Sequence, residues 1–260
     1  METLHVTRWG QAGPKVIMVH GSAQGSRTGG DRHFARQQIL GERGWEVLVP
    51  DRPGHGLSAD PGRPDDAAAD GALIAELIGD GAHLVGHSFG GCVALAATVL
   101  RPDKVHSLTL IEPAMPLLAM NKLVVLRFGI KVAMVSLLPM SNASRLERFV
   151  KLVNVPPELR GTDGADPAEL DRMGLALKRL RLPSKKTLQE QLHLVRDARI
   201  PLLGVTGSWS PAFRTITEVA VAAASGRMLT IESPHHFPHL VSDEFNEALA
   251  TFMTEGEGRG

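Results

Sequence analysis

The chain has 260 residues, with 28 Lys and Arg against 28 Asp and Glu, so its formal net charge is zero. This length suits one or two domains, and 43% hydrophobic against 22% charged residues excludes a disordered chain. The neutral balance argues against a general nucleic-acid or anionic-membrane binder, while a single cysteine, Cys92, excludes an internal disulfide framework and suits a reducing, cytoplasmic compartment.

Short runs rich in Val, Ile and Leu recur along the chain, and helix-compatible sequence separates them. They cover residues 16–19, 45–49, 83–85, 108–111, 202–205 and 229–231. Such runs with helical connections are what a parallel sheet covered on both faces requires. Residues 4–8 could add an antiparallel edge strand ahead of it. The sequence therefore predicts an α/β fold, a three-layer and mostly parallel sheet with helices on both faces.

The alternation is interrupted once, between residues 113 and 199. This segment has no convincing strand and has helix breaks at several prolines, which predicts a helical insertion into a core made of residues 1–112 and 200–260. It holds 15 Lys and Arg against 8 Asp and Glu, so it is +7 and the remainder −7, and it holds five of the nine methionines. Two interpretations stay open: a solvated outer face with methionines filling the core, or an adaptable, mildly basic lid over a pocket.

The sequence predicts neither a membrane-spanning helix nor a signal peptide. The longest apolar stretch, residues 123–138, is interrupted by Arg127, Gly129 and Lys131, whereas a membrane span needs about 20 mostly uncharged residues. The first residues have no apolar core of signal-peptide length. We therefore expect no membrane partner.

The strongest chemical signal is a serine between two glycines. Residues 86–90 read Gly-His-Ser-Phe-Gly, directly after the run at 83–85, and the small residues 90–97 then open a helix. A strand, a sharp turn and a helix hold a serine in a strained, exposed position, where the helix N-terminus favours developing negative charge. This context favours Ser88 as a nucleophile over a structural serine in a tight turn.

Four further segments have recognisable spacing. Residues 20–23 read His-Gly-Ser-Ala after the first buried run, and residues 51–58 read Asp-Arg-Pro-Gly-His-Gly-Leu-Ser. Residues 110–113 read Leu-Ile-Glu-Pro, and residues 233–238 read Ser-Pro-His-His-Phe-Pro. Together with the serine motif they resemble the α/β-hydrolase family, in its lid-bearing single-domain branch, over nearly the whole chain. The resemblance implies a serine hydrolase that needs no cofactor.

A serine nucleophile needs a base, and histidine is suited because it titrates near neutrality. The resemblance places the base in the late histidine loop, which makes His236 the candidate and His235 its alternative. The other histidines read as turn, surface or core residues, with His87 as a wall of the pocket. No cluster of ligands has metal-binding spacing, so we expect no metal.

The acid is where the chain departs from the common family pattern. The family usually has a Gly-x-x-Asp-Pro stretch after the strand that follows the insertion, but residues 207–211 read Gly-Ser-Trp-Ser-Pro. Ser210 has the sequence of a helix N-cap, with Pro211 at the first helical position. Glu112 ends the strand next in order after the nucleophile, a position that holds the acid in some branches of the family, so we predict it as the acid. Alternatively, Glu112 lines the hinge of the insertion and the acid is absent or comes from the insertion.

Two backbone N–H groups, those of Phe89 and Ser22, are the expected oxyanion hole. We expect the substrate to contact His87, Met115, Trp209 and Phe237. The glycine-rich residues 21–30 invite a phosphate-binding interpretation, but no Gly-Lys-Ser/Thr follows them, so nucleotide binding is set aside.

The predicted activity is acyl transfer to water through an acyl-serine. The apolar insertion favours a carboxylic ester or lactone of a mainly hydrophobic small molecule. Two alternatives stay open: a carbon–carbon bond hydrolase acting on a diketone-type substrate, and a non-catalytic ligand binder on the same fold. We expect a small-molecule substrate, no nucleic-acid partner, and a monomer or homodimer.

Overall fold

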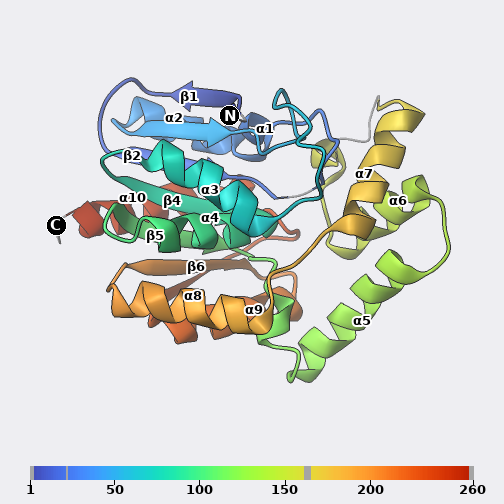
Figure 1. Ribbon diagram of the computed structural model, residues 1–260. Helices are drawn as coiled ribbons and strands as arrows, with labels where there is room; N and C mark the ends of the chain where they lie inside the picture. Colours follow the sequence, from blue (N-terminus) through green and yellow to red (C-terminus); the bar gives the residue numbers. More distant parts are fainter. Residues whose placement is uncertain (1–2, 22, 161–164, 258–260) are drawn as a thin grey trace.

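The computed structural model describes residues 3–21, 23–160 and 165–257, and its centre is one sheet (Figure 1). In these residues the sheet has seven strands in the order β1-β3-β2-β4-β5-β6-β7. The strands are β1 (Val6–Trp9), β2 (Lys15–Val19), β3 (Glu46–Pro50), β4 (Ala82–His87), β5 (Val105–Ile111), β6 (Leu202–Gly207) and β7 (Arg227–Ile231). β1 pairs with β3 in antiparallel orientation and every other pair is parallel. The predicted parallel sheet is confirmed.

The apolar runs form strands because their side chains are covered on both sides. All six residues of β4 and all six of β6 are buried, as parallel strands between two helix layers must be. The edge strands β1 and β7 are only partly covered, and their sequences contain more polar residues. The degree of burial therefore follows the strand order.

The helices form one layer on each face of the sheet (Figure 1). One layer holds α3 (Ala67–Ile78), α4 (Phe89–Leu100), α8 (Lys185–Asp197) and α9 (Pro211–Ala224). The other holds α1 (Gly30–His33), the short 3-10 turn η1 (Ala35–Gln37), α2 (Gln38–Glu42) and α10 (Glu244–Glu257). Each layer shares one buried apolar cluster with the sheet, and alternate strand residues enter one cluster or the other. The three-layer α/β fold is thereby confirmed.

The segment between β5 and β6 corresponds to the insertion predicted at residues 113–199. It contains the 3-10 turns η2 (Pro116–Leu118) and η3 (Pro157–Leu159) and the helices α5 (Leu123–Leu137), α6 (Asn142–Leu152), α7 (Pro167–Arg179) and α8. We call α5, α6 and α7 the inserted helices. They lie beyond both helix layers, at the right of Figure 1, past the carboxyl ends of the strands.

The last helix of this segment behaves differently from the other three. Leu188, Leu192 and Val195 form one apolar stripe on α8, and all three are fully buried in the cluster between the sheet and its helices. α8 therefore packs in the layer of α4 and α9, although its sequence lies inside the predicted insertion.

Local capping explains where the later helices begin. Ser141, Asp166 and Ser184 precede α6, α7 and α8, and each side chain accepts a hydrogen bond from a backbone N–H of the first turn. α7 also has proline at its first position, where the missing N–H costs nothing.

Candidate active site

Ser88 occupies the sharp turn between β4 and α4. Its φ of 55° and ψ of −122° are rare for a residue with a side chain, and such a conformation costs about 1–3 kcal/mol unless its surroundings impose it. Three backbone hydrogen bonds do so. The N–H of Ser88 donates to the Ile111 carbonyl at 2.9 Å, and its carbonyl accepts from Gly91 at 3.0 Å and from Ala114 at 2.9 Å. The turn is therefore tied to the neighbouring strand β5.

Glycine is required on both sides of this turn. A Cβ at Gly86 would overlap the carbonyl of Gly90, and a Cβ at Gly90 would overlap the carbonyl of Val19 on β2. No side chain could be accommodated without moving backbone, which explains the Gly-x-Ser-x-Gly pattern in physical terms.

His236 and Glu112 are 124 positions apart and meet at the carboxyl edge of the sheet. Glu112 directly follows β5, and His236 lies in the loop between β7 and the 3-10 turn η4 (Pro238–Leu240). Their side chains are buried, and Nδ1 of His236 lies 2.6 Å from Oε2 of Glu112. A carboxylate can only accept, so Nδ1 carries the proton and Nε2 of the neutral ring keeps its lone pair.

The Glu112 carboxylate receives further hydrogen bonds from the end of β6 and the loop after it. The Gly207 N–H donates to Oε1 at 2.8 Å, and the Trp209 indole N–H lies 3.0 Å from both oxygens. The Thr206 hydroxyl donates to Oε1 at 3.4 Å. Glu112 is fully buried, so these donors replace the water that its charge has lost.

Ser210, which stands in the usual position of the acid, has a structural role. Its hydroxyl accepts a hydrogen bond from the Phe213 N–H at 3.3 Å, and Pro211 follows it at the first position of α9. This is the geometry of a helix N-cap. The loop that carries the acid in the common family pattern here supplies hydrogen-bond donors to Glu112 instead.

Of the two residues expected to form the oxyanion hole, Phe89 lies within the described residues. Phe89 is the first residue of α4, so its N–H has no acceptor within the helix and points out at the helix N-terminus. Gly21 passes next to the nucleophile, since a Cβ on it would lie 3.1 Å from Cβ of Ser88. Ser22 lies outside the described residues.

A buried arginine supports the loop that carries Gly21. Arg52 is fully buried; its Nε donates to the His20 carbonyl at 3.1 Å and its Nη2 to the Gly21 carbonyl at 2.9 Å. Its Nη1 donates to Asp65 at 2.7 Å and to Asp70 at 2.8 Å. Burial alone would lower the pKa of Arg52, but the two carboxylates raise it above its ordinary value. The charge is therefore retained beneath the site.

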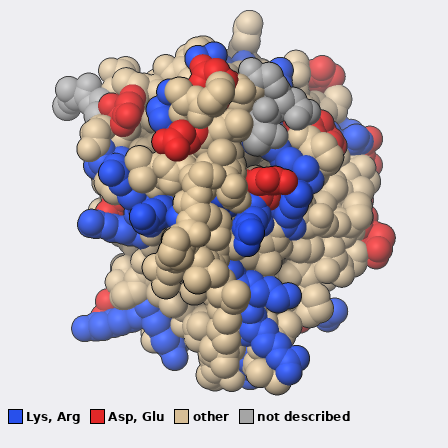
Figure 2. Space-filling model, turned by 90° about the vertical axis from the view of Figure 1, so that its right-hand side faces the viewer, with Lys and Arg blue, Asp and Glu red and all other residues tan. Residues whose placement is uncertain are grey.

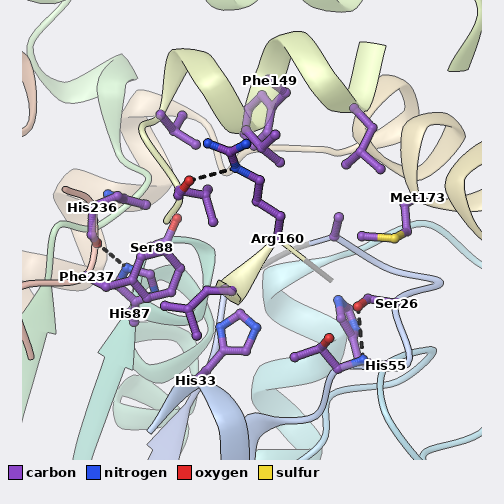
Figure 3. Close-up of a pocket in the computed structure, with 18 residues that line it drawn as sticks. Ser26, His33, His55, His87, Ser88, Phe149, Arg160, Met173, His236 and Phe237 are labelled. Atoms are coloured by element: carbon purple, nitrogen blue, oxygen red, sulfur yellow. Dashed lines mark hydrogen bonds between the residues drawn. The ribbon is translucent and has the colours of Figure 1, made fainter. Parts of the chain in front are cut away.

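Ser88 and His236 line the same cavity, which lies between the strand ends and the inserted helices (Figure 3). Its volume is about 60 Å³. The side of the sheet contributes Gly21, Ala23, Ser26, Thr28, His33, His55, His87 and Phe237, and the segment after β5 contributes Leu146, Phe149, Val150, Val153, Val155, Leu159, Arg160 and Met173. The wall formed by the insertion is thus mainly apolar, with one arginine.

Two of the four residues predicted to contact substrate line this cavity, and two do not. His87 and Phe237 are wall residues, and Nε2 of His87 donates to the His236 carbonyl at 2.8 Å. Met115 is fully buried in the cluster between the sheet and α4, α8 and α9, because the chain turns inward there after β5. The Trp209 indole N–H donates to the Glu112 carboxylate, so Trp209 contacts the partner of His236 and does not line the cavity.

Most residues of the cavity wall were not predicted from the sequence, and three of them have titratable or charged side chains: His33, His55 and Arg160. Burial lowers the pKa of His33 to about 4, and burial followed by the charge of Arg52 lowers that of His55 to about 3, so both rings are neutral at pH 7. The glycine-rich turn at residues 51–58 was a signal for His55, since it follows a strand end. Nothing in the sequence distinguished Arg160 from the other basic residues of the insertion.

The one cysteine of the chain does not supply a second nucleophile. Cys92 lies buried in α4, and burial raises the pKa of its thiol to about 12, so it does not compete as a nucleophile. Among residues 3–21, 23–160 and 165–257, no three or more His, Cys, Asp or Glu side chains are arranged to hold a metal ion. Within the same residues, no helix has the length and apolar character needed to cross a membrane.

The sheet order, the strained serine and the late histidine loop define an α/β hydrolase. The model of the alpha/beta hydrolase family matches residues 16–248, and the chain belongs to this family.

Individual relatives are similar over shorter stretches. Lipase LipV of Mycobacterium tuberculosis is 36% identical over 118 residues, which are 44% of this chain and 43% of the relative. Esterase Rv0045c of the same organism is 30% identical over 112 residues, 40% of this chain and 35% of the relative. The chain thus spans less than half the length of the curated relatives it matches. An esterase from Exiguobacterium antarcticum has the same fold, with a TM-score of 0.71 and 19% identity over 96% of this chain and 95% of that one.

Proposed function

We propose that the protein is a serine hydrolase that cleaves a carboxylic ester or lactone of a mainly hydrophobic small molecule through an acyl-enzyme. The observation that carries this proposal is the buried hydrogen bond from His236 to Glu112 at the wall of the cavity that also holds Ser88. Membership of the alpha/beta hydrolase family and the local similarity to a lipase and an esterase support hydrolase activity.

Each group in the proposed mechanism has one task. Nε2 of His236 takes the proton of Ser88 while Oγ attacks the substrate carbonyl, and the Glu112 carboxylate stabilises the imidazolium that forms. The N–H groups of Phe89 and Ser22 stabilise the oxyanion. His236 then donates its proton to the leaving alcohol, and the acyl-serine remains. Water attacks the acyl carbonyl as one of its protons passes to His236; His236 then returns this proton to Oγ of Ser88 as the acyl–Oγ bond breaks, and the carboxylic acid leaves.

The inserted helices are proposed to act as a lid. A cavity of about 60 Å³ is small against the roughly 300–1,000 Å³ of ordinary ligand pockets, so the helices must move to admit substrate. Asn154, between α6 and α7, connects them to the histidine loop. Its carbonyl accepts from the His236 N–H at 3.4 Å, and its Nδ2 donates to the Pro234 carbonyl at 2.5 Å. Movement of the lid would therefore change the position of the loop that carries His236, the proposed base.

A substrate panel with a labelling reagent tests the proposal. Wild type, Ser88→Ala and the matched control Ser210→Ala are assayed on p-nitrophenyl esters, lactones and diketones. Separate samples are treated with a p-nitrophenyl alkylphosphonate, from which Ser88 would displace p-nitrophenolate. We expect ester or lactone turnover and one phosphonate adduct per chain at Ser88 in wild type and in Ser210→Ala. Ser88→Ala should show no adduct, and its turnover should fall by at least a thousandfold.

Other results would replace the proposal. Turnover of the diketones alone would move the function to a carbon–carbon bond hydrolase that uses the same residues. No adduct and no turnover in wild type would leave a ligand binder on the hydrolase fold.

A further inference from the structure

Arg160 carries the one permanently charged side chain among the described residues that line the cavity. It follows the 3-10 turn η3, and Figure 3 shows its side chain crossing the middle of the pocket. The other polar lining residues are serine, threonine and histidine, and no Asp or Glu is among the described ones. Among the described lining side chains, the one fixed charge is therefore positive.

The guanidinium is oriented before any ligand arrives. Nε of Arg160 donates to the Val155 carbonyl at 2.9 Å, which leaves the two Nη groups for other acceptors. In the described part of the chain no carboxylate forms an ion pair with it. A planar, anchored guanidinium with two open donor groups matches the two oxygens of a carboxylate.

The apolar surroundings of Arg160 strengthen the interactions that its charge can make. Leu146, Phe149, Val150, Val153, Leu159 and Met173 are apolar neighbours on the same wall. In such an environment a charged hydrogen bond is worth more than in water. Burial lowers the pKa of His33, His55 and His87, so these rings stay neutral at pH 7 and add no second charge. One guanidinium balances a carboxylate monoanion, whereas a phosphate dianion would need more.

The outer surface favours the approach of an anion. Residues 113–199 carry 15 Lys and Arg against 8 Asp and Glu. Figure 2 shows Lys and Arg side chains spread over the face formed by the inserted helices. A basic surface around the cavity raises the local concentration of anionic substrate.

We propose that Arg160 is a specificity-determining residue that binds a carboxylate of the substrate, so that the preferred substrates are esters or lactones that carry a free carboxylate elsewhere in the molecule. This inference rests on the proposed function. It narrows the substrate from a hydrophobic ester to one with an apolar chain between the scissile carbonyl and an anionic group.

Matched pairs of substrates test the inference. One member of each pair is the p-nitrophenyl half-ester of an aliphatic dicarboxylic acid, and the other is the neutral p-nitrophenyl ester of the same chain length. Wild type should prefer the half-ester at one or more chain lengths. Arg160→Gln should lower the ratio of the two kcat/KM values about tenfold to a hundredfold, mainly through KM. Arg160→Lys should retain part of the preference, and Arg160→Glu should reverse it.

The control is Arg148→Gln, which removes an equal charge from the exposed surface of α6, outside the cavity. This variant should keep the wild-type ratio. No preference in wild type, an equal loss on both substrates in Arg160→Gln, or an equal change of the ratio in Arg148→Gln would each overturn the inference.

Calorimetry separates this inference from the proposed function. Adipate and its uncharged diamide, adipamide, are titrated into wild type and into Arg160→Gln, a measurement that needs no turnover. Tighter binding of adipate by wild type, lost in Arg160→Gln, supports the carboxylate site even if no ester is cleaved. Equal binding of adipate by both proteins overturns it even if esters are cleaved.

Discussion

Replacement of Glu112 by glutamine removes one charge and keeps the shape of the side chain. In wild type the carboxylate accepts from Gly207, Trp209 and His236. The Gln oxygen can still accept from the N–H groups of Gly207 and Trp209, so its NH₂ group turns toward Nδ1 of His236. An NH₂ group donates, so Nδ1 must then accept, and the proton of the neutral ring moves to Nε2. The histidine is thereby left in the tautomer that cannot act as the base.

The expected loss follows from the geometry. The imidazolium formed in the transition state has its charge about 4 Å from that of Glu112, and at an effective dielectric constant of about 20 such a pair is worth about 4 kcal/mol. At about 1.4 kcal/mol per decade, the Glu112→Gln variant should lose about three orders of magnitude in kcat. The wrong tautomer adds to this, so the loss should lie between about a thousandfold and ten-thousandfold.

The assay is kcat on a p-nitrophenyl ester, with thermal unfolding measured alongside to show that the variant is folded. Glu232→Gln is the matched control. Glu232 is exposed after β7 and accepts from the Ser208 hydroxyl at 2.9 Å, so its replacement should change kcat by less than about twofold. A folded Glu112→Gln enzyme with more than about a tenth of wild-type kcat would refute the reasoning and assign the acid elsewhere.

Acid should unfold the protein early, because burial lowers the pKa of His33 to about 4 and of His55 and His239 to about 3. These pKa values lie below the value of 6.5 in the unfolded chain, so below about pH 6.5 the unfolded chain binds more protons than the folded one. The free energy of unfolding is therefore highest above about pH 6.5 and falls as the pH drops toward about 4. At pH 5 the three groups together should lower the free energy of unfolding by about 6 kcal/mol. Urea unfolding at pH 7 and pH 5 would measure this loss, and equal urea midpoints at the two pH values would contradict the prediction. Separately, Ser210→Ala should lose about 1 kcal/mol of stability in thermal unfolding, because the Phe213 N–H loses its cap, while kcat stays near wild type; a large fall in kcat would mean that Ser210 takes part in the chemistry.

The strands could be predicted because a parallel sheet between two helix layers needs uninterrupted apolar runs. The run at residues 202–205 lies inside β6, and the run at 229–231 lies inside β7. The ends of the strands were less visible. β7 begins at Arg227 and β3 at Glu46, since the backbone of a partly exposed strand end pairs as well with a polar side chain as with an apolar one.

The surface that a helix covers could not be predicted from its own periodicity. The apolar stripe of α8 would suit either an insertion or the sheet, and only the assembled fold shows that Leu192 lies against the sheet layer. Arg160 is a similar case. Its position in the cavity depends on how α6 and α7 fold back over the strand ends, a long-range property that no local pattern contains.

In the candidate site, the position of Glu112 could be predicted from the order of the strands. Consecutive strands end at the same edge, and this placed Glu112 near Ser88 on the sequence alone. Trp209 was expected to contact substrate, but it is not among the residues that line the cavity. The structure shows its indole N–H at the carboxylate of Glu112, and this difference depends on a single side-chain direction.

The hydrogen bonds between the turn at Ser88 and strand β5 have a consequence for how the molecule could be divided. Ser88 and Glu112 belong to one continuous β4–α4–β5 unit, in which His87 pairs with Ile111 and the Ser88 N–H is bonded to the Ile111 carbonyl. The spacing of the proposed nucleophile and the proposed acid is therefore built into 25 consecutive residues. His236 arrives from beyond the insertion. A cut within the inserted helices would leave Ser88 and Glu112 on one fragment and His236 on the other. Neither fragment would then hold all three residues, so activity would measure reassembly of the two fragments.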